Sequence, residues 1–381
     1  MKNKNEEFRK KKILFVSGTR ADFGKLEPLA SEAFNNGFHI TFFITGMHML
    51  EKYGLTKEEV SSHKEFETIE FLNQRDGDPQ DVILSKTILG FSDYLNELNP
   101  DLVVIHGDRV EALACSIVCA TNYYLSAHIE GGEVSGTIDE LFRHCNSKLC
   151  SLHLVSSDKA KKRVLQLGEP ETNIFVIGSP ELDLHGSDSG VDINEVKKRY
   201  DIKFDEFGIC IFHPVTSEIN SIEQQAESLF NSLENSGKNF VVILPNNDPG
   251  NKKIKNKINN LDSKRFKVLP SMRFNYFSEL IKNCSIFIGN SSAGVRELPF
   301  LGICSIDIGS RQLRRSDAKS IIPISPYDSD QIIKAINNNW NKKFQPDLEY
   351  GKGNAAKKFA EILLKENIWN NPLQKNFRDQ L

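Results

Sequence analysis

Long apolar runs are missing from this 381-residue sequence. A membrane-spanning helix needs about 20 consecutive apolar residues, and no segment approaches that length. The charged start, MKNKNEEFRKKK, leads into a short apolar stretch at residues 13–16. Because that stretch is too short for the apolar region of a signal peptide, we expect neither a membrane protein nor a secreted one.

The chain also lacks an excess of either charge and a paired cysteine framework. Its 48 Lys and Arg nearly balance 51 Asp and Glu, for a net charge of −3, which argues against a general nucleic-acid binder. The seven cysteines are odd in number and scattered, with no CxxC pair among them. We therefore expect free, buried thiols and a cytoplasmic protein.

Short apolar blocks alternate with longer amphipathic ones, a pattern typical of strands and helices around a parallel sheet. The predicted strands are residues 13–18, 39–46, 101–107, 124–131, 152–157 and 173–179, followed by 207–213, 240–245, 266–271, 285–290 and 303–309. The predicted helices between them include 82–98, 221–236 and 276–283. The fold class is therefore α/β, with two doubly wound domains facing a cleft.

The length favours two domains, because a domain typically holds about 100–200 residues. We expect an N-terminal domain at 1–185 and a C-terminal domain at 186–365, with residues 185–206, which are polar and turn-rich at their start, as the linker. The pattern from residue 353 predicts one long amphipathic helix and a cap, and the tail at 366–381 would pack across the seam between the domains. Ligands of open α/β sheets lie beyond the carboxyl ends of the strands, so residues there are the candidates for a site.

The first strand ends in the tight turn Gly18–Gly24. Two interpretations stay open for this turn: Arg20 contacts a phosphate beside the N–H groups of the helix start, or Asp22 caps the helix in an ordinary strand-to-helix turn. The turn lacks the GxGxxG spacing, so a nicotinamide-type dinucleotide is poorly supported.

Three carboxylates follow strands or open a helix in the first domain. Asp108 follows one strand, Glu130 follows another and precedes two glycines, and Asp139 opens a helix. Each has a structural alternative, such as Asp108 as an N-cap and Asp139 as the i,i+4 ion-pair partner of Arg143. Two adjacent glycines suit a ligand that approaches the backbone closely. Together the three acids predict an acid–base site, because neighbouring carboxylates shift one another's pKa values.

In the second domain, His213 lies at the end of a strand. It is either a hydrogen-bonded structural residue or a functional one, acting as an acid or an electrostatic stabiliser. The segment 288–297 runs from a strand through small residues into a helix, whose start offers N–H groups and hydroxyls to a diphosphate. The residues of this start are Ser291, Ser292 and Gly294. Glu297 lies one turn further on, where it would accept from a ribose diol; the alternative for the segment is a plain serine N-cap.

Two His–acid pairs raise the question of a metal. His106 with Asp108, and His128 with Glu130, are spaced i,i+2, so they share a face only while the strand persists. We expect no metal and no other cofactor.

A set of short motifs in fixed order resembles one enzyme family. The motifs are GTRADFGKL, ITGMH, IHGDRVEALA, HIEGGEVSGTIDELFRH, GSPELD, FHPVT, PNND and GNSSAGVRELP. They resemble the hydrolysing UDP-N-acetylglucosamine 2-epimerases of bacterial sialic acid synthesis. The resemblance runs from about Lys12 to the last helix.

This resemblance implies a glycosyltransferase-B-like architecture, with two Rossmann-like domains around a UDP-sugar cleft. It implies that UDP-N-acetylglucosamine and water give N-acetylmannosamine and UDP, by anti elimination to 2-acetamidoglucal and then hydration. The family's catalytic carboxylates match Asp108, Glu130 and Asp139, and its active-site histidine matches His213. Its substrate contacts match Arg20, Ser291 and Ser292 for the diphosphate, Glu297 for the ribose, and one of Phe274, Tyr276 and Phe277 for the uracil.

In the related non-hydrolysing epimerases, the pair that opens this helix resembles two adjacent glutamates. This chain has Asp139-Glu140 at that position, which favours the hydrolysing branch. Glu140 stays an alternative to Asp139. A sister group that acts on UDP-N,N'-diacetylbacillosamine, for legionaminic acid, shares most of the motifs, so the sugar substituents at C4 and C6 stay open.

Two other functions stay open as well: a two-domain glycosyltransferase, which needs an acceptor sugar, and a non-catalytic UDP-sugar sensor, in which the three acids have no obvious purpose. The expected partners are UDP-N-acetylglucosamine and UDP, without nucleic acid or membrane. Because the family is often dimeric, the resemblance also implies a homodimer.

Overall fold

The computed structural model describes residues 11–135, 138–186, 190–246 and 248–379. By its internal contacts the chain divides into two units. Unit 1 comprises Met1–Glu133, Ile138–Asp183 and Gly351–Leu381, and unit 2 comprises Val134–Thr137 and Leu184–Tyr350. One boundary lies close to the expected residue 185, whereas the other lies at Gly351 instead of after residue 365.

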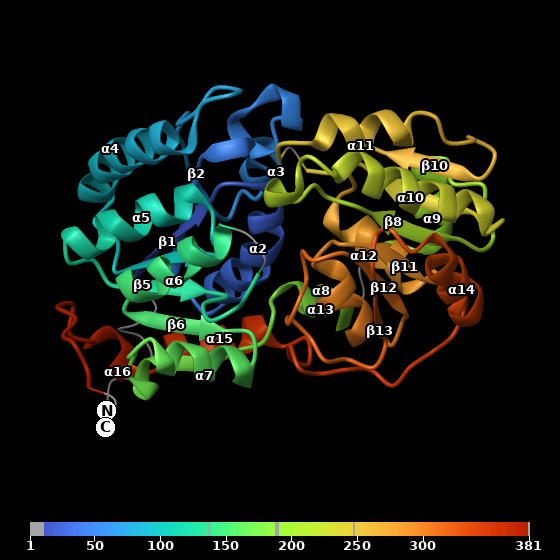
Figure 1. Ribbon diagram of the computed structural model, residues 1–381. Helices are drawn as coiled ribbons and strands as arrows, with labels where there is room; N and C mark the ends of the chain where they lie inside the picture. Colours follow the sequence, from blue (N-terminus) through green and yellow to red (C-terminus); the bar gives the residue numbers. More distant parts are fainter. Residues whose placement is uncertain (1–10, 136–137, 187–189, 247, 380–381) are drawn as a thin grey trace. The chain divides into compact units, whose positions relative to one another are not determined.

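Unit 1 is built on a seven-stranded parallel sheet in the order β3-β2-β1-β4-β5-β6-β7 (Figure 1). Its strands are β1 (Lys12–Ser17), β2 (His39–Ile44), β3 (Glu67–Glu70), β4 (Leu102–His106), β5 (Ser126–Ile129), β6 (Leu152–Val155) and β7 (Ile174–Val176). Its helices are α2 (Arg20–Asn35), α3 (Lys57–Ser61), α4 (Gln80–Leu98), α5 (Val110–Thr121), α6 (Asp139–Leu149), α7 (Asp158–Gln166), α15 (Ala355–Leu363) and α16 (Glu366–Trp369), and α8 (Glu181–Gly186) contains the boundary to unit 2.

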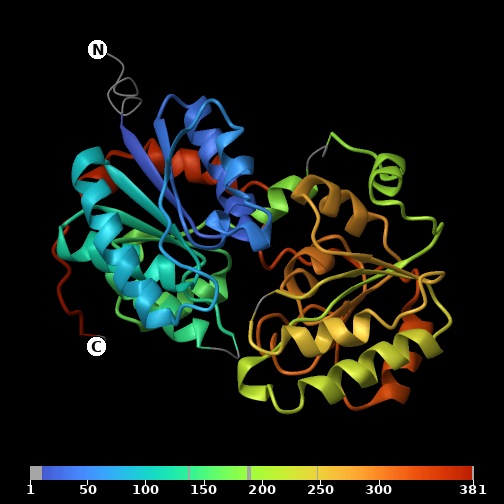
Figure 2. The same ribbon diagram turned by 90° about the horizontal axis from the view of Figure 1, so that it is seen from above.

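Helices cover both faces of this sheet, which is why its strands are apolar almost throughout. Ile13 of β1 packs in one core with Leu26 of α2 and Phe359 of α15. The next residue, Leu14, packs in the opposite core with Phe91 of α4, since successive strand side chains point to opposite faces. Figure 2 shows α15, near the C-terminal end of the chain, beside α2 near the other end.

Unit 2 repeats this plan with six parallel strands in the order β10-β9-β8-β11-β12-β13. The strands are β8 (Gly208–Ile211), β9 (Phe240–Ile243), β10 (Phe266–Leu269), β11 (Phe287–Gly289), β12 (Ser305–Ile308) and β13 (Ile321–Ile324). The helices are α9 (Ile193–Tyr200), α10 (Ile222–Asn235), α11 (Asn251–Ile258), α12 (Phe274–Lys282), α13 (Ala293–Phe300) and α14 (Ser329–Asn339). Cys210 packs with Leu229 of α10, and the adjacent Ile209 with Leu280 of α12, so this sheet is also covered on both faces.

The two doubly wound α/β units confirm the expected fold class, but two strands escape prediction, and both lie at a sheet edge. β3 exposes its two glutamates and only half-buries the residues between them. β13 contains Pro323, which lacks the N–H of a ladder bond and is tolerated at an edge. Edge strands are covered less than central ones, so their apolar signal in the sequence is weak.

The C-terminal segment forms two helices, so the expected single long helix is wrong. α15 ends at Leu363, Lys365 is extended (φ −90°, ψ 126°), and α16 then begins. The break lets the Trp369 indole N–H donate to the Leu363 carbonyl at 2.9 Å while its ring stacks on Phe38. The described part of this tail belongs to unit 1, and residues 380–381 lie outside the described residues.

All seven cysteines are free thiols, as expected; six are buried, and Cys145 is half-buried. Within the described ranges, no helix combines the length and apolar character that crossing a membrane would require.

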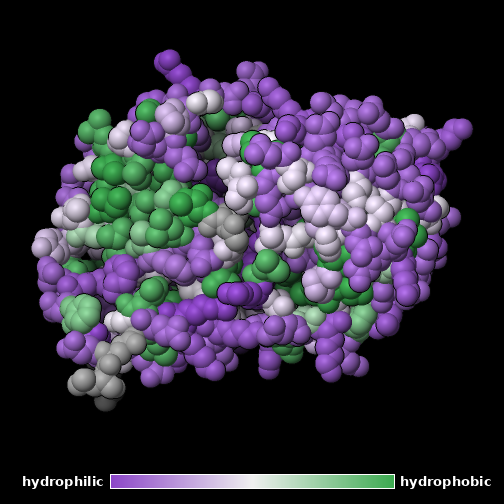
Figure 3. Space-filling view, in the orientation of Figure 1, coloured by the Kyte–Doolittle hydropathy of each residue, from purple (hydrophilic) through white to green (hydrophobic). Residues whose placement is uncertain are grey.

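An apolar patch lies over α4 and α5 and appears green in Figure 3. We define this apolar patch as the exposed Leu89 of α4 and Leu141 of α6, with the half-buried Leu113 and Ile117 of α5. Leu89 is 70 % exposed and Leu141 is 56 % exposed. Contiguous exposed apolar side chains are typical of an interaction surface.

Candidate active site

The order of the strands locates a ligand site in each unit. In unit 1 the chain places β2 and β3 on one side of β1 and β4 on the other, so the order reverses between β1 and β4. In unit 2 the same reversal lies between β8 and β11. Open α/β sheets bind ligands beyond the carboxyl ends of strands at such a switch point. Four of the predicted residues follow these four strands: Arg20, Asp108, His213 and Ser291.

The turn after β1 leads directly into α2. Thr19 is the N-cap, and its hydroxyl accepts from the Asp22 N–H at 3.1 Å. Arg20 is the first residue of α2, and its Nη2 lies 2.9 Å from Glu59 Oε1 of α3. The guanidinium therefore lies at the helix start, paired with a carboxylate that a phosphate would have to share or replace.

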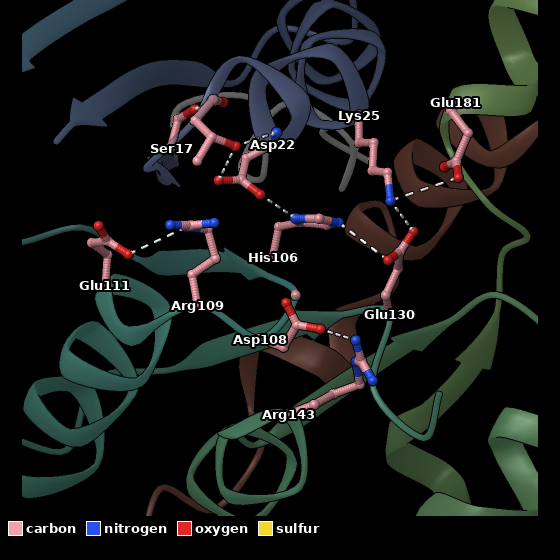
Figure 4. A network of polar contacts seen from close by, with 12 residues as sticks. Ser17, Asp22, Lys25, His106, Asp108, Arg109, Glu111, Glu130, Arg143 and Glu181 are labelled. Carbon is pink, nitrogen blue, oxygen red and sulfur yellow. Dashed lines mark hydrogen bonds and ion pairs between the residues drawn. The ribbon is translucent and has the colours of Figure 1, made fainter. Parts of the chain in front are cut away.

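Asp22 does not cap α2 but reaches His106 at the end of β4 (Figure 4). Its Oδ1 accepts from His106 Nδ1 at 2.9 Å, and its Oδ2 accepts from the Thr19 hydroxyl at 2.9 Å. Burial alone would raise the pKa of Asp22, but the hydrogen bond and charge of His106, with the charge of Arg109, hold it at about 2. Asp22 is therefore ionised at neutral pH and keeps a proton on His106 Nδ1.

Glu130 follows β5 in a left-handed backbone conformation (φ 65°), which disfavours an ordinary side chain by roughly 1–2 kcal/mol. The residue is 4 % exposed. Its Oε1 accepts from Lys25 Nζ at 2.7 Å and from the Ser179 hydroxyl at 3.4 Å, while its Oε2 lies 3.4 Å from His106 Nε2. A strained backbone that holds a buried charge at a strand end points to function.

The histidine between these acids has an unusual environment. Burial favours its neutral form, but Glu130 and Asp22 outweigh burial and raise the pKa of His106 above its ordinary value. Beyond Glu130, Lys25 Nζ lies 3.6 Å from Glu181 Oε1. We call Asp22, His106, Glu130, Lys25 and Glu181 the charge chain, because acidic and basic groups alternate along it (Figure 4).

Asp108 forms an ion pair with the buried Arg143 of α6. The N-cap of α5 is Arg109, so Asp108 is not the cap that its position suggests. Arg143 Nη1 also donates to the Glu133 carbonyl at 3.3 Å, which ties α6 to the segment after β5. The structure thus places Arg143, the i,i+4 neighbour of Asp139, against Asp108.

Asp139 is the first residue of α6 and is half-buried. The adjacent Glu140 Oε1 lies 3.6 Å from His144 Nε2. Residues 136–137 of the motif that precedes this helix lie outside the described residues.

The two glycines after Glu130 make room for protein, which corrects their interpretation as space for a ligand. A Cβ on Gly132 would lie 2.3 Å from the Ala160 carbonyl oxygen, and one on Gly131 would lie 2.7 Å from Ser147 Oγ.

His128 donates from Nε2 to the Gly107 carbonyl at 2.7 Å, and burial lowers its pKa to about 3, so it is neutral. Among the described residues, no group of three or more His, Cys, Asp or Glu is arranged to hold a metal ion.

In unit 2, His213 follows β8 and is locked to the end of β11. Asn290 Oδ1 accepts from the His213 N–H at 2.6 Å, and Asn290 Nδ2 donates to the His213 carbonyl at 2.8 Å. His213 Nδ1 accepts from the Asn246 N–H at 3.0 Å, so the ring proton lies on Nε2. Burial and the charge of Arg311 lower the pKa of His213 to about 3, so the ring is neutral and Nε2 can donate a hydrogen bond. Asn247 of the PNND motif lies outside the described residues.

The serine-rich segment after β11 opens α13 as predicted. Ser291 and Ser292 are half-buried at the helix start. The Gly294 N–H donates to the Ser291 carbonyl at 3.0 Å and is therefore engaged in the first turn. A Cβ on Gly294 would lie 2.6 Å from Ser305 Oγ, so this glycine lets α13 approach β12.

Glu297, the expected ribose contact, is bonded to a histidine that the sequence did not indicate. His185 Nε2 lies 2.6 Å from Glu297 Oε2, and His185 Nδ1 lies 2.7 Å from Ser278 Oγ. The half-buried Phe274 ring lies 5.7 Å from the His185 ring. Tyr276 is buried, and its hydroxyl donates to Glu195 at 2.9 Å. Phe274 is thus the more accessible of these two aromatic candidates for a base.

Most of the charge chain was not predicted from the sequence. Asp22 was expected only as a helix cap, His106 was paired only with Asp108, and no role was assigned to Lys25 or Glu181. One signal was present: Asp22 and Lys25 lie one turn apart on the face of α2 that carries its buried apolar residues. Charged side chains on an apolar stripe are rarely buried without partners.

Comparison with known proteins agrees with these observations. Residues 32–364 match the family model described as UDP-N-acetylglucosamine 2-epimerase. The chain is 42 % identical to the UDP-N-acetylglucosamine 2-epimerase of Neisseria meningitidis serogroup B, over 97 % of this chain and 99 % of that protein. It is 29 % identical to the UDP-N,N'-diacetylbacillosamine 2-epimerase (hydrolyzing) of Legionella pneumophila, over 93 % and 95 %.

The fold is also that of a solved structure. A Neisseria meningitidis UDP-GlcNAc 2-epimerase crystallised with UDP-GlcNAc matches with a TM-score of 0.79 at 21 % identity, over 93 % of this chain and 99 % of that one. The family match covers most of the chain, and the 42 % identical relative spans nearly all of it. The chain belongs to the UDP-N-acetylglucosamine 2-epimerase family.

Proposed function

We propose that this protein is a hydrolysing 2-epimerase that converts UDP-N-acetylglucosamine and water into N-acetylmannosamine and UDP. The observation that carries the proposal is Glu130, a strained and buried carboxylate held by Lys25 and His106 at the carboxyl end of the unit 1 sheet. Asp108 follows the neighbouring strand, and Asp139 opens the helix that supplies its partner Arg143. Asp108 follows β4 at the switch point of the fold and Glu130 follows the adjacent strand β5, where proton-transfer groups can meet a ligand.

The chemistry requires such a set. The proton on C2 of the sugar is feebly acidic, so cleavage of the C1–O bond leads, through an oxocarbenium-like state. A carboxylate then takes the C2 proton, and the electron pair of that C–H bond forms the double bond of 2-acetamidoglucal. In the second half, a different acid returns a proton to C2 on the opposite face, water adds its oxygen at C1, and the third carboxylate takes the proton that this water loses. Asp108, Glu130 and Asp139 share these roles.

Departure of UDP needs stabilisation of negative charge, and the proposal assigns it to Arg20 and the start of α13. The helix start contributes N–H groups and the Ser291 and Ser292 hydroxyls. His213, being neutral with its proton on Nε2, contributes a hydrogen-bond donor without a charge to desolvate. Glu297 and Phe274 are assigned to the ribose and the base.

The test is incubation with UDP-N-acetylglucosamine in deuterated water. We expect UDP and N-acetylmannosamine that carries deuterium at C2. N-acetylglucosamine as the product, or a product without deuterium, contradicts the proposal. Release of UDP that depends on an added acceptor sugar identifies a glycosyltransferase instead.

A second substrate has one observation in its favour, the similarity to the Legionella diacetylbacillosamine epimerase. Competition between the two UDP-sugars in one reaction decides between them. Because identity is higher to the Neisseria enzyme, we expect UDP-N-acetylglucosamine to be consumed faster.

We also propose a cytoplasmic homodimer in which the apolar patch is buried. The free cysteines support a reducing compartment, and the exposed Leu89 and Leu141 support a contact surface. Light scattering should give twice the chain mass for the wild type, and a Leu89→Ser, Leu141→Ser variant should shift toward monomer. A monomeric wild type contradicts the proposal.

A further inference from the structure

One part of the charge chain, the hydrogen-bonded pair Asp22 and His106, is not explained by the catalytic assignment of Glu130. His106 Nδ1 is hydrogen-bonded to Oδ1 of Asp22. The other carboxylate oxygen of Asp22 accepts from the Thr19 hydroxyl at the start of α2. With Nδ1 committed to Asp22, the other ring nitrogen, Nε2, lies toward Glu130 Oε2 at 3.4 Å (Figure 4). Glu130 Oε1 is separately held by Lys25.

We propose that Asp22 and His106 form a positioning dyad that stores the proton exchanged by Glu130. This inference rests on the proposed function, in which Glu130 exchanges a proton with C2 of the sugar. When Glu130 has gained a proton, its O–H bond breaks, the electron pair stays on Oε2, and His106 Nε2 forms the new N–H bond. Once the product has left, the dyad returns the proton to Glu130 by the reverse step, Glu130 gives it to the water that replaces the product, and Asp22 stays ionised throughout.

Inversion at C2 makes such a store necessary. The group that removes the C2 proton and the group that replaces it lie on opposite faces of the sugar, so each turnover leaves one with a proton gained and the other with a proton lost. Glu130 is 4 % exposed and has little access to bulk water. Lys25, an ammonium that donates to Oε1, cannot accept that proton, whereas a neutral His106 can.

The other buried histidines of unit 1 that the structure describes show how specific this arrangement is. Burial lowers the pKa of His48 to about 4, with Ser17 and Thr56 hydroxyls as its partners, and that of His128 to about 3. Burial also lowers the pKa of His153, which faces Glu169. His106 alone among these four lies between two carboxylates and has a raised pKa.

The charged groups around the dyad come from several elements. Asp22 and Lys25 are on α2, Glu130 follows β5, Glu181 is on α8, and Arg109 precedes α5 and adds a positive charge that acts on Asp22. Replacing Asp22 by asparagine removes one negative charge beside His106. The His106–Glu130 pair then binds its shared proton less tightly, so the pKa of the pair falls.

The experiment is the pH profile of kcat/KM for UDP release by wild type and Asp22→Asn. In Asp22→Asn, we expect the limb of the profile that belongs to the His106–Glu130 pair to move to lower pH by about one unit or more. The kcat at neutral pH should fall roughly 10- to 100-fold, whereas the Kd for UDP should change less than twofold. The matched control is Glu169→Gln, which removes a carboxylate from the buried His153 outside the charge chain and should leave both limbs in place. An active, folded Asp22→Asn protein whose limbs do not move overturns the dyad.

Nuclear magnetic resonance of the wild-type protein with labelled histidines gives a readout that needs no variant to fold. The ring of His106 should titrate above the ordinary range, whereas those of His48 and His128 should stay neutral down to about pH 5. A His106 ring that is already neutral at pH 6, or that is still protonated at the pH of maximal activity, overturns the proposal, because the dyad must both hold and release the proton. If the wild type does not convert UDP-N-acetylglucosamine, the proposed function fails instead, so the two failures are distinguishable.

Discussion

Two buried carboxylates of unit 1, Glu130 and Glu169, each contact a histidine and a lysine. The two sites differ in which other acids these histidines and lysines contact. Glu169 accepts from His153 Nε2 at 3.0 Å, from Lys148 at 2.7 Å and from Lys375 at 2.6 Å. Burial alone would raise the pKa of Glu169, but these partners hold it at about 2. Lys375 also donates to the Cys150 carbonyl at 2.6 Å, which anchors the C-terminal segment.

The cations around Glu130 are shared with other acids. His106 also bonds Asp22, and Lys25 also approaches Glu181. Three partners converge on Glu169 and fix its charge, which suits a structural role. Because its cations are shared with other acids, Glu130 is held less exclusively than Glu169, which suits a group that exchanges a proton. The comparison shows that burial and a histidine neighbour do not by themselves mark a catalytic acid.

The largest expected effect comes from removing the carboxylate of Glu130. Glu130→Gln keeps the shape of the side chain but cannot take up a proton, so kcat should fall roughly 10³-fold while the Kd for UDP changes little. Steady-state UDP release and calorimetric UDP binding measure the two quantities. Glu169→Gln, the matched variant, should keep kcat within about twofold; an equal loss of activity in both variants would erase the distinction between the two carboxylates.

The second expected effect is on stability, for which Glu169 should matter more than Glu130. Glu169→Gln leaves two lysines without their carboxylate and should lower the free energy of unfolding by about 2–3 kcal/mol, less than the full cost of breaking a buried pair because Lys148 is half exposed. Lys375→Met, which removes one of three partners, should cost less. Urea unfolding measures both changes. A Glu169→Gln protein as stable as the wild type would refute the structural role.

The smallest effect is a pH dependence. The pKa of Glu169 is about 2 in the folded protein against an ordinary 4.5, so its ionisation stabilises the fold fully above about pH 4.5, and this stabilisation is lost as the pH falls toward 2. The difference in unfolding free energy between wild type and Glu169→Gln should therefore shrink between about pH 5.5 and pH 3. A difference that stays constant over this range would mean that Glu169 is not held ionised.

The fold was largely predictable because its signals are local. Blocks such as 13–18 and 240–245 are apolar over their whole length, and both proved to be central strands covered on two faces. β3 and β13 escaped because an edge strand buries less, and the break at Lys365 escaped because amphipathic periodicity continues across it. The folding-back of residues 351–379 onto unit 1 depends on contacts with α2, far away in the sequence.

The charge balance and the missing apolar runs bounded the protein class, and the strand pattern determined by itself that Asp108, Glu130, His213 and Ser291 lie at strand ends. Only the tertiary structure decided their partners. It placed Arg143 against Asp108, Asp22 against His106, 84 positions apart, and Lys25 against Glu130, 105 positions apart. The reason is physical: strand and helix periodicity come from neighbouring residues, whereas the proton affinity of a buried acid depends on which charges the folded chain brings within a few ångströms of it.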